Sequence, residues 1–212
     1  MLEDCSLAIL AGGMGSRFGG SDKQGALIQG VPLGRRVALN ALTSGLPVTL
    51  VGLQRDIYHG LPLRFIHDIV PGYGPLSGLH AALVYSTTPW VFLLACDMPY
   101  FDLHWLSYLS SLVDSPDDLA LSLAILAQRE SYVEPFQGLY SRSLITGLER
   151  KMDNSGVTGE KLSFSGLLGD LPHTRVPEAV ARRFSPDWSL FLSINDVSAL
   201  EAFQGGLTGE AL

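Results

Sequence analysis

Short apolar runs alternate along the chain with segments whose apolar residues follow a helical spacing. The expected strands of the first half are Ser6–Ala11, Val48–Leu53, Arg64–His67 and Trp90–Ala95. The expected helices are Pro32–Ser44, Leu76–Tyr85 and Asp102–Val113, the last of them capped by Asp102. Two of the strands are almost wholly apolar, as parallel strands covered on both faces are. The pattern predicts an α/β fold: a single domain with a Rossmann-like, mostly parallel sheet and helices on both faces.

The second half is less regular. Its expected strands are Leu119–Leu126, Phe136–Tyr140 and Ser189–Ile194, its expected helix is Ser143–Arg150, and its expected polar loop is Met152–Gly159. A closing helix, capped near Asp196, is expected to follow. We find no internal repeat and no low-complexity linker, so the 212 residues predict one domain.

A glycine-rich segment follows the first expected strand: Leu10-Ala11-Gly12-Gly13-Met14-Gly15-Ser16-Arg17-Phe18-Gly19-Gly20-Ser21-Asp22-Lys23. Bare backbone amides in such a turn form a concave donor surface that suits phosphate oxygens. Arg17 can bind a phosphate through two N–H groups, and Lys23 adds a compact positive charge. Phe18 stands where a dinucleotide-binding GxGxxG needs glycine, and Ser21 breaks a P-loop. A phosphate-binding turn is therefore the favoured interpretation, and a flexible loop with incidental charges is the alternative.

Asp97 follows the apolar run Trp90–Ala95. The carboxyl ends of parallel strands form the edge of a sheet where ligands bind. A carboxylate oxygen is the ligand that Mg²⁺ prefers. Asp97 is therefore a candidate Mg²⁺ ligand at the same edge as the glycine-rich turn, if the two strands are parallel neighbours. The alternative is that Asp97 caps the segment that begins at Pro99.

Composition narrows the class of function. The formal net charge is −7, which argues against a general nucleic-acid binder. No apolar stretch approaches the roughly 20 residues of a membrane span. Two cysteines, Cys5 and Cys96, are expected to be reduced core thiols. Because acidic Glu3 and Asp4 precede only a short apolar run, we expect no leader and a cytoplasmic location.

The segment LAGGMGSRFGGSDKQ resembles the signature loop of the nucleotidyltransferases that include molybdenum cofactor guanylyltransferase, the MobA type. Relatives in that superfamily activate sugar phosphates, methylerythritol phosphate or, with CTP, molybdopterin. Gly12-Gly13 and Asp22-Lys23 are more similar to the guanylyltransferase than to the cytidylyltransferases. The run from Asp68 through Gly74-Pro75-Leu76-Ser77-Gly78 is similar to an element that encloses the nucleotide in this family, and Asn195 lies in an Asn-containing element before the closing helix.

The resemblance implies a fold like that of the nucleotide-diphospho-sugar transferases. About residues 1–115 would bind the nucleotide, and about residues 116–205 would bind the acceptor. The implied nucleotide-binding residues are Leu10, Ala11, Gly12, Gly13, Gly15, Lys23, Asp68, Gly78 and Asp97. Arg17, Lys23 and Asp97 would be catalytic, and Asp97 would hold Mg²⁺, with Asn195 as a further candidate ligand. Gly52 and Ser193 depart from the family pattern, which often has Asn at both positions.

The implied reaction is transfer of GMP from GTP to molybdopterin, with release of pyrophosphate. Molybdoenzymes or cofactor-delivery proteins are candidate partners, whereas no nucleic acid and no membrane are expected. Two alternatives stay open at this point. One is a related transferase that uses CTP or a sugar phosphate, and the other is a non-catalytic protein that binds and delivers a nucleotide or cofactor.

Overall fold

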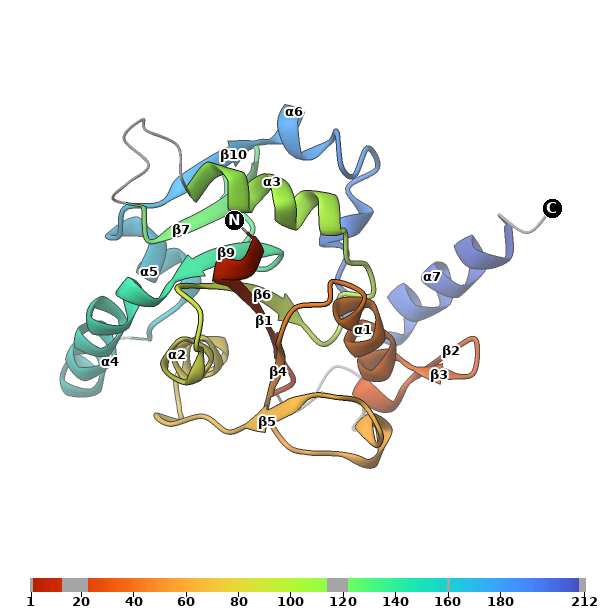
Figure 1. Cartoon of the computed structure of the whole chain (residues 1–212), viewed down its shortest axis with the longest axis horizontal. Coiled ribbons are helices and arrows are strands. Elements are labelled where there is room, and N and C mark those ends of the chain that lie inside the picture. Colours follow the sequence, from red (N-terminus) through yellow and green to blue (C-terminus); the bar gives the residue numbers. More distant parts are fainter. Residues whose placement is uncertain (1, 13–22, 114–121, 160, 210–212) are drawn as a thin grey trace.

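An eight-stranded sheet forms the centre of the molecule (Figure 1). The structure is a computed structural model that describes residues 2–12, 23–113, 122–159 and 161–209. The strand order is β10-β7-β9-β6-β1-β4-β5, and β8 pairs with β7 outside this path. The strands are β1 (Cys5–Leu10), β4 (Val48–Val51), β5 (Arg64–Ile66), β6 (Trp90–Ala95), β7 (Ala124–Arg129), β8 (Tyr132–Val133), β9 (Gly138–Ser141) and β10 (Thr174–Pro177).

The four strands β6-β1-β4-β5 are parallel, whereas β9 is antiparallel to both β6 and β7. Strand β10 is parallel to β7. A separate hairpin of β2 (Leu27–Ile28) and β3 (Val31–Pro32) lies beside α1. The sheet is thus mostly parallel.

Helices cover both faces of the sheet, because side chains alternate between the two faces along each strand. In β1, Leu7 and Ile9 belong to a core with residues of α1 and α3, whereas Ala8 and Leu10 belong to a second core with residues of α2 and α4. The helices are α1 (Leu33–Leu42), α2 (Pro75–Tyr85), α3 (Leu103–Val113), α4 (Ile145–Thr158), α5 (Phe164–Gly169), α6 (Glu178–Ala181) and α7 (Val197–Gly209). The 3₁₀ turns are η1 (Leu2–Asp4), η2 (Lys23–Gly25), η3 (Asp56–Tyr58), η5 (Arg142–Leu144) and η6 (Ser189–Phe191). The predicted fold class is confirmed.

The predicted helix caps are also confirmed. Asp102 Oδ1 accepts from the backbone N–H of His104 at 2.6 Å at the start of α3. Asp196 Oδ1 accepts from the backbone N–H of Ala199 at 2.8 Å at the start of α7. Each carboxylate therefore satisfies an amide that the helix itself leaves unpaired.

Several predictions for the second half are wrong in detail. The expected polar loop Met152–Gly159 is helical through Thr158, because Leu148 and Met152 lie one turn apart and both are buried. The expected strand Ser189–Ile194 is instead η6 followed by an irregular segment. Its side chains Leu190, Phe191 and Ile194 are buried, but this segment pairs with no strand of the sheet.

The remaining differences concern boundaries. The strand expected at Leu119–Leu126 runs from Ala124 to Arg129, and positions 119–121 lie outside the described residues. The strand expected at Phe136–Tyr140 is β9, Gly138–Ser141. The expected helix Ser143–Arg150 becomes η5 followed by α4.

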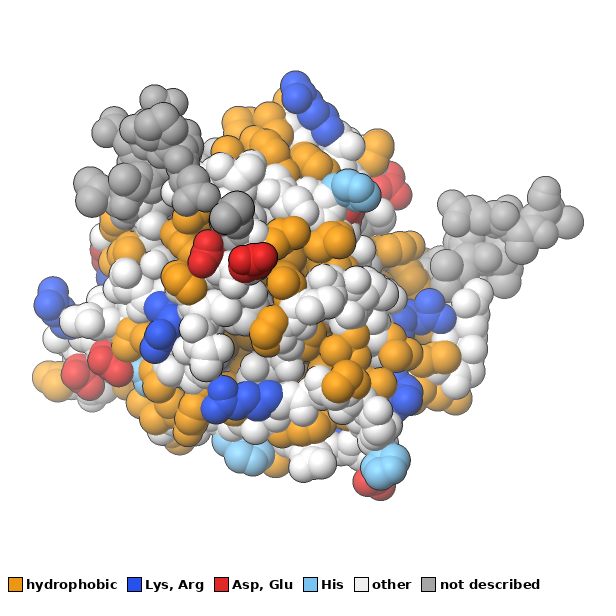
Figure 2. All heavy atoms as spheres, viewed as in Figure 1, with side chains coloured by type: hydrophobic (Ala, Val, Ile, Leu, Met, Phe, Trp, Pro, Cys, Tyr) orange, Lys and Arg blue, Asp and Glu red, His pale blue; other side chains and the backbone are white. Residues whose placement is uncertain are grey.

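Charged side chains of both signs are interspersed over the described surface in Figure 2, without an extended basic patch on that face. Within the residues that the structure describes, no helix is long and apolar enough to cross a membrane. The two cysteines are buried.

Candidate active site

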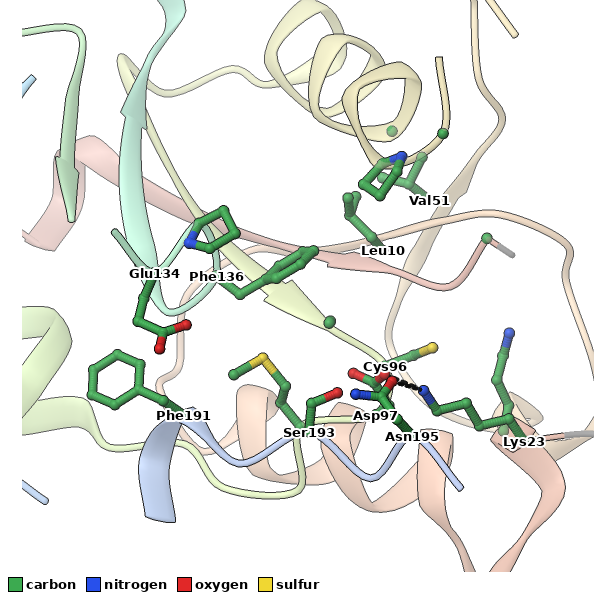
Figure 3. A pocket seen from close by; sticks show the side chains of 18 of the residues that line it. Leu10, Lys23, Val51, Cys96, Asp97, Glu134, Phe136, Phe191, Ser193 and Asn195 are labelled. Carbon is green, nitrogen blue, oxygen red and sulfur yellow. Dashed lines mark hydrogen bonds and ion pairs between the residues drawn. The ribbon is translucent and has the colours of Figure 1, made fainter. Parts of the chain in front are cut away.

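A cavity of about 770 Å³ opens where β1, β4 and β6 end. Its walls come from segments far apart in the sequence, as Figure 3 shows. Seven of the residues singled out from the sequence line it: Leu10, Gly12, Lys23, Asp68, Gly78, Asp97 and Asn195. The structure therefore brings together the described ends of the glycine-rich segment, the Asp68 and Gly78 segments and the closing Asn-containing segment at one edge of the sheet.

Asp97 reaches the cavity because β1 and β6 are adjacent and parallel. Leu10 pairs in register with Ala95, and the Cys96 N–H donates to the Leu10 carbonyl at 3.1 Å. The two strands therefore end side by side, so Gly12 and Asp97 lie at the same edge, as the sequence predicted. The capping alternative for Asp97 is wrong, because the next helix begins at Leu103.

Lys23, Asp97 and Asn195 form a polar cluster on one side of the cavity (Figure 3). Lys23 Nζ makes an ion pair with Asp97 Oδ2 and donates to Asn195 Oδ1 at 2.8 Å. The Ile194 N–H donates to the Asp97 carbonyl at 2.9 Å, which places Asn195 beside Asp97. The Lys23 and Asp97 side chains are only 18% and 14% exposed, so water screens their attraction less than at an open surface.

The second oxygen of the Asp97 carboxylate is suited to a cation. Asp97 Oδ1 is buried and has no hydrogen-bond partner among the described residues. A buried carboxylate oxygen without a partner is costly, and a bound cation would remove that cost. The described residues contain no group of three or more His, Cys, Asp or Glu side chains arranged around a metal. A single carboxylate fits Mg²⁺, which commonly takes one or two carboxylates and completes its shell with water and substrate phosphates.

Gln24 is a site residue that the sequence reasoning did not single out. It is buried, its Nε2 donates to the Ala11 carbonyl at 2.6 Å, and its Oε1 accepts from the Tyr58 hydroxyl at 2.8 Å. The first bond ties η2, which begins at Lys23, to the residue after β1, and the second ties it to η3. The one feature of the sequence that could have identified Gln24 is its position directly after Lys23. Ala11, by contrast, is buried and supplies its carbonyl to this network rather than a side chain to the cavity lining.

Two glycines owe their presence to close packing. A Cβ at Gly78 would lie 2.9 Å from Leu10 Cδ2, so a larger residue there would require the Leu10 side chain to move. Gly52 has φ of +145°, and a Cβ would lie 2.9 Å from the Ala11 carbonyl carbon. The departure from Asn at position 52 therefore has a steric reason in this chain.

Asp68 lies at the rim of the cavity, where it is exposed. Partial burial raises the pKa of its carboxyl, and the neighbouring His67 opposes that rise. Gly13, Gly15 and Arg17 lie outside the described residues, so their roles stay predictions.

The far end of the cavity differs in chemistry. It is lined by Tyr132, Glu134, Pro135, Phe136 and Phe191. Figure 3 shows Glu134, Phe136 and Phe191 on the side of the cavity away from Lys23. One cavity thus joins a polar end that contains Lys23, Asp97 and Asn195 to an aromatic end with a single carboxylate among the described lining residues.

Comparison with known proteins identifies the family. A family model described as MobA-like NTP transferase domain matches residues 7–163. The chain belongs to this family. The predicted resemblance is thereby confirmed.

Individual relatives agree with this assignment. A probable molybdenum cofactor guanylyltransferase of Peptoclostridium acidaminophilum is 32% identical over 93% of this chain and 87% of its own. A molybdenum cofactor guanylyltransferase of Syntrophotalea carbinolica is 32% identical over 90% of this chain and 86% of its own. The crystal structure of molybdopterin-guanine dinucleotide biosynthesis protein A from Archaeoglobus fulgidus superposes with a TM-score of 0.77 at 24% identity, covering 96% of this chain and 99% of that one. That structure supports the fold.

Proposed function

We propose that this protein transfers GMP from GTP to molybdopterin, which yields the guanine dinucleotide form of the cofactor and releases pyrophosphate. The observation that carries the proposal is the cluster of Lys23, Asp97 and Asn195 in a cavity at the carboxyl ends of the strands, in a MobA-like NTP transferase. The choice of GTP and molybdopterin is supported by the two relatives named molybdenum cofactor guanylyltransferase.

The reaction forms one bond and breaks one. An oxygen of the acceptor phosphate bonds to the α-phosphorus of GTP, and the bond from that phosphorus to the bridging oxygen of the departing pyrophosphate breaks. The second pKa of a phosphomonoester is near 6, so the attacking oxygen is mostly ionised at neutral pH and needs no general base. Catalysis then depends on positioning and on neutralising charge.

The chain's own residues fit these two tasks. Lys23 lines the cavity and can neutralise charge on the phosphates, with Arg17 as a second candidate. Asp97, with Asn195 beside it, would hold Mg²⁺ through the carboxylate oxygen that has no partner. Bound Mg²⁺ supplies positive charge to the phosphate oxygens in phosphoryl-transfer chemistry. Asp68 and Gly78 border the part of the cavity proposed for the nucleoside.

The ion pair between Lys23 and Asp97 has a consequence for binding. Lys23 Nζ pairs with Asp97 Oδ2, whereas Asp97 Oδ1 has no partner among the described residues. We propose that Lys23 moves from the Asp97 carboxylate to the phosphates when GTP and Mg²⁺ bind. The negative charge of Asp97 would then be neutralised by the metal instead of by Lys23. Cys5 and Cys96 are buried thiols, which fits a reducing compartment, and we propose a cytoplasmic location.

A thermal-shift panel with Mg²⁺ and each of GTP, CTP, UTP and ATP tests the nucleotide assignment through ligand-linked stabilisation. We expect GTP to raise the melting temperature most. When molybdopterin is added, we expect the GMP part of GTP to be transferred to it and pyrophosphate to be released. Equal shifts for all four nucleotides would overturn the guanine assignment. A preference for CTP would instead favour the cytidylyl-transferring relatives, and binding of GTP without any turnover would favour a delivery protein.

A further inference from the structure

The aromatic end of the cavity contains a carboxylate, Glu134, which several buried and charged side chains hold in place. Glu134 is half-buried, lines the cavity and is the one charged residue among the described lining residues at that end. Phe136 and Phe191 line the cavity at the same end (Figure 3), and Tyr132, which is 54% exposed, adds a third aromatic side chain.

The segment that bears Glu134 is held rigidly. The Gln137 N–H donates to the Leu93 carbonyl of β6 at 2.8 Å. The Gln137 side-chain amide donates to the carbonyls of Tyr100 at 2.8 Å and Leu190 at 3.1 Å. The Gln137 backbone carbonyl accepts from Trp105 Nε1 at 2.7 Å. These bonds join the Glu134 segment to β6, to α3 and to the segment that carries Phe191.

Trp188 lies next to the Glu134 carboxylate. The Trp188 side chain lies close enough to the Glu134 carboxyl for its one N–H donor to lower the pKa of that group. The guanidinium groups of Arg129 and Arg182 lie over the Trp188 ring at 5.4 and 5.5 Å from its centroid. Trp188 is itself buried, so its orientation is constrained by packing as well as by these two cations.

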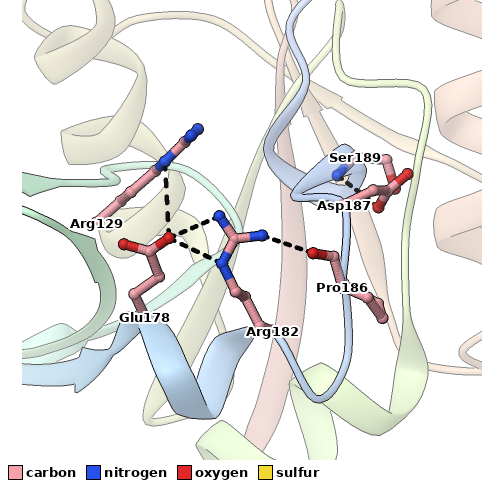
Figure 4. A network of polar contacts seen from close by, with 6 residues as sticks. All are labelled: Arg129, Glu178, Arg182, Pro186, Asp187 and Ser189. Atoms are coloured by element: carbon pink, nitrogen blue, oxygen red, sulfur yellow. Dashed lines mark hydrogen bonds and ion pairs between the residues drawn. The ribbon is translucent and has the colours of Figure 1, made fainter.

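Glu178 fixes the two arginines in turn (Figure 4). Its Oε1 accepts from Arg182 Nε at 2.8 Å and lies 3.9 Å from Arg129 Nε. Arg182 also donates to the Pro186 carbonyl at 2.6 Å. A continuous chain of contacts therefore runs from Glu178 through the arginines and Trp188 to Glu134.

This support has an electrostatic effect on the carboxyl group. Burial raises the pKa of Glu134, whereas the Trp188 N–H and the charge of Arg129 act in the opposite direction. One Trp N–H occupies only part of the acceptor capacity of a carboxylate. The remaining capacity can be used by donors on a molecule in the cavity.

A flat heterocycle with two adjacent N–H donors matches this end of the cavity. Aromatic side chains can contact its faces, and a carboxylate can accept from both donors at once, as it does from the fork of an arginine. The 2-amino-4-oxo edge of a pterin presents such a pair at N3 and the 2-amino group. We propose, resting on the proposed function, that Glu134 is the specificity-determining residue that binds the 2-amino-4-oxo edge of the acceptor's pterin ring, with Trp188 as its positioning residue.

Two ring probes test this directly by binding to the full chain. The first probe is 6-hydroxymethylpterin, and the second is 6-hydroxymethyllumazine, which has an oxygen in place of the 2-amino group. The wild-type protein should bind the pterin at least about tenfold more tightly, because the carboxylate repels the added carbonyl oxygen. Glu134→Gln keeps the shape and presents an amide that can pair with that oxygen, so the preference should shrink to about threefold or less, or reverse.

Steady-state kinetics supplies the second measurement. In Glu134→Gln the KM for molybdopterin should rise about tenfold or more, as expected for loss of a charged hydrogen bond, while KM for GTP stays within about twofold. Glu130→Gln is the matched control, because Glu130 is exposed in the nearby β7–β8 turn and loses the same charge. Trp188→Phe should raise the acceptor KM to a smaller extent, and adding it to Glu134→Gln should have little further effect.

The outcomes separate this inference from the proposed function. If the wild type guanylylates molybdopterin and Glu134→Gln leaves its KM unchanged, the inference is wrong and the proposed function stands. If the wild type binds GTP but transfers nothing to molybdopterin, the proposed function is wrong, and the ring probes still decide the inference. Equal binding of the two rings by the wild type, or binding of neither, would overturn the role of Glu134.

Discussion

The two ends of the cavity are built in different ways. At the end proposed for GTP, parallel strands β1 and β6 finish side by side, and Asp97 follows directly from a strand. At the aromatic end, Glu134 lies between β8 and β9, next to the antiparallel part of the sheet, and depends on contacts with segments near residues 178–191. The first end is positioned mainly by local backbone geometry, whereas the second is positioned by long-range side-chain contacts.

This difference indicates that the proposed reaction uses separate parts of the fold for charge neutralisation and for recognition of the acceptor. Charge neutralisation for nucleotidyl transfer lies at the rigid edge of the parallel strands, where an ion pair already holds Lys23 against Asp97. Recognition of the acceptor ring lies on a separate set of elements. Substitutions at the first end should therefore change turnover and GTP binding, and substitutions at the second should change acceptor binding alone.

The largest effect is expected for Asp97→Asn. This change keeps the shape but removes the charge that would hold Mg²⁺, so turnover should fall by roughly 10²-fold or more, or about 2.7 kcal/mol. GTP affinity without Mg²⁺ should change little or improve, because a carboxylate repels phosphates when no cation is present. Both quantities are measured on the same purified variant. The comparison between the two ends predicts that binding of a pterin probe stays unchanged.

Asp102→Asn is the control for that substitution. Asp102 caps α3, and Asn is an equally good cap, so activity and stability should remain near those of the wild type. Near-normal turnover in Asp97→Asn would remove Asp97 from the proposed metal site.

A smaller effect is expected for Lys23→Ala. Loss of the ammonium should weaken Mg-GTP binding by on the order of tenfold and reduce turnover. Because Lys23 pairs with a largely buried Asp97, the metal-free protein should also lose roughly 1–2 kcal/mol of stability. Calorimetry for GTP binding and thermal unfolding with and without Mg²⁺ measure the two effects.

Lys151→Ala provides the matched control, since Lys151 also pairs with an aspartate. That aspartate, Asp170, has a side chain that is 71% exposed, whereas the Asp97 side chain is 14% exposed. It should change stability by less than about 0.5 kcal/mol and leave GTP binding intact. Normal GTP binding in Lys23→Ala would mean that the lysine serves Asp97 rather than the nucleotide.

The smallest effect concerns the stability of Glu134→Gln. Burial raises the folded-state pKa of Glu134, so its ionised form is less favourable in the folded protein than in the unfolded chain. The variant should therefore melt roughly 1–3 °C higher than the wild type above the raised pKa. The difference should shrink as the pH falls through the folded pKa and vanish below the unfolded value. Melting curves across this pH range check it, and a less stable variant at neutral pH would show that Glu134 is retained for folding.

The sequence by itself determined the parallel half of the fold and most of its site. Buried parallel strands are marked by apolar runs, and their carboxyl ends lie at one edge by topology, so Gly12 and Asp97 could be placed together before any coordinates. The helix caps could also be predicted from the sequence, because Asp102 and Asp196 accept hydrogen bonds from backbone N–H groups only two or three residues further along the chain.

Tertiary structure decided what depends on distant partners. Met152 is helical because burial of its face outweighs the polar composition around it, and Phe191 belongs to no strand although its segment is apolar. Gln24 acquires its role from Tyr58 and Ala11, and Glu134 acquires its support from Trp188 and the arginines over that ring. Periodicity reports which face of an element is apolar, but it carries no information on which distant side chain will meet that face. Side-chain networks of this kind arise only when the packed sheet brings their members together.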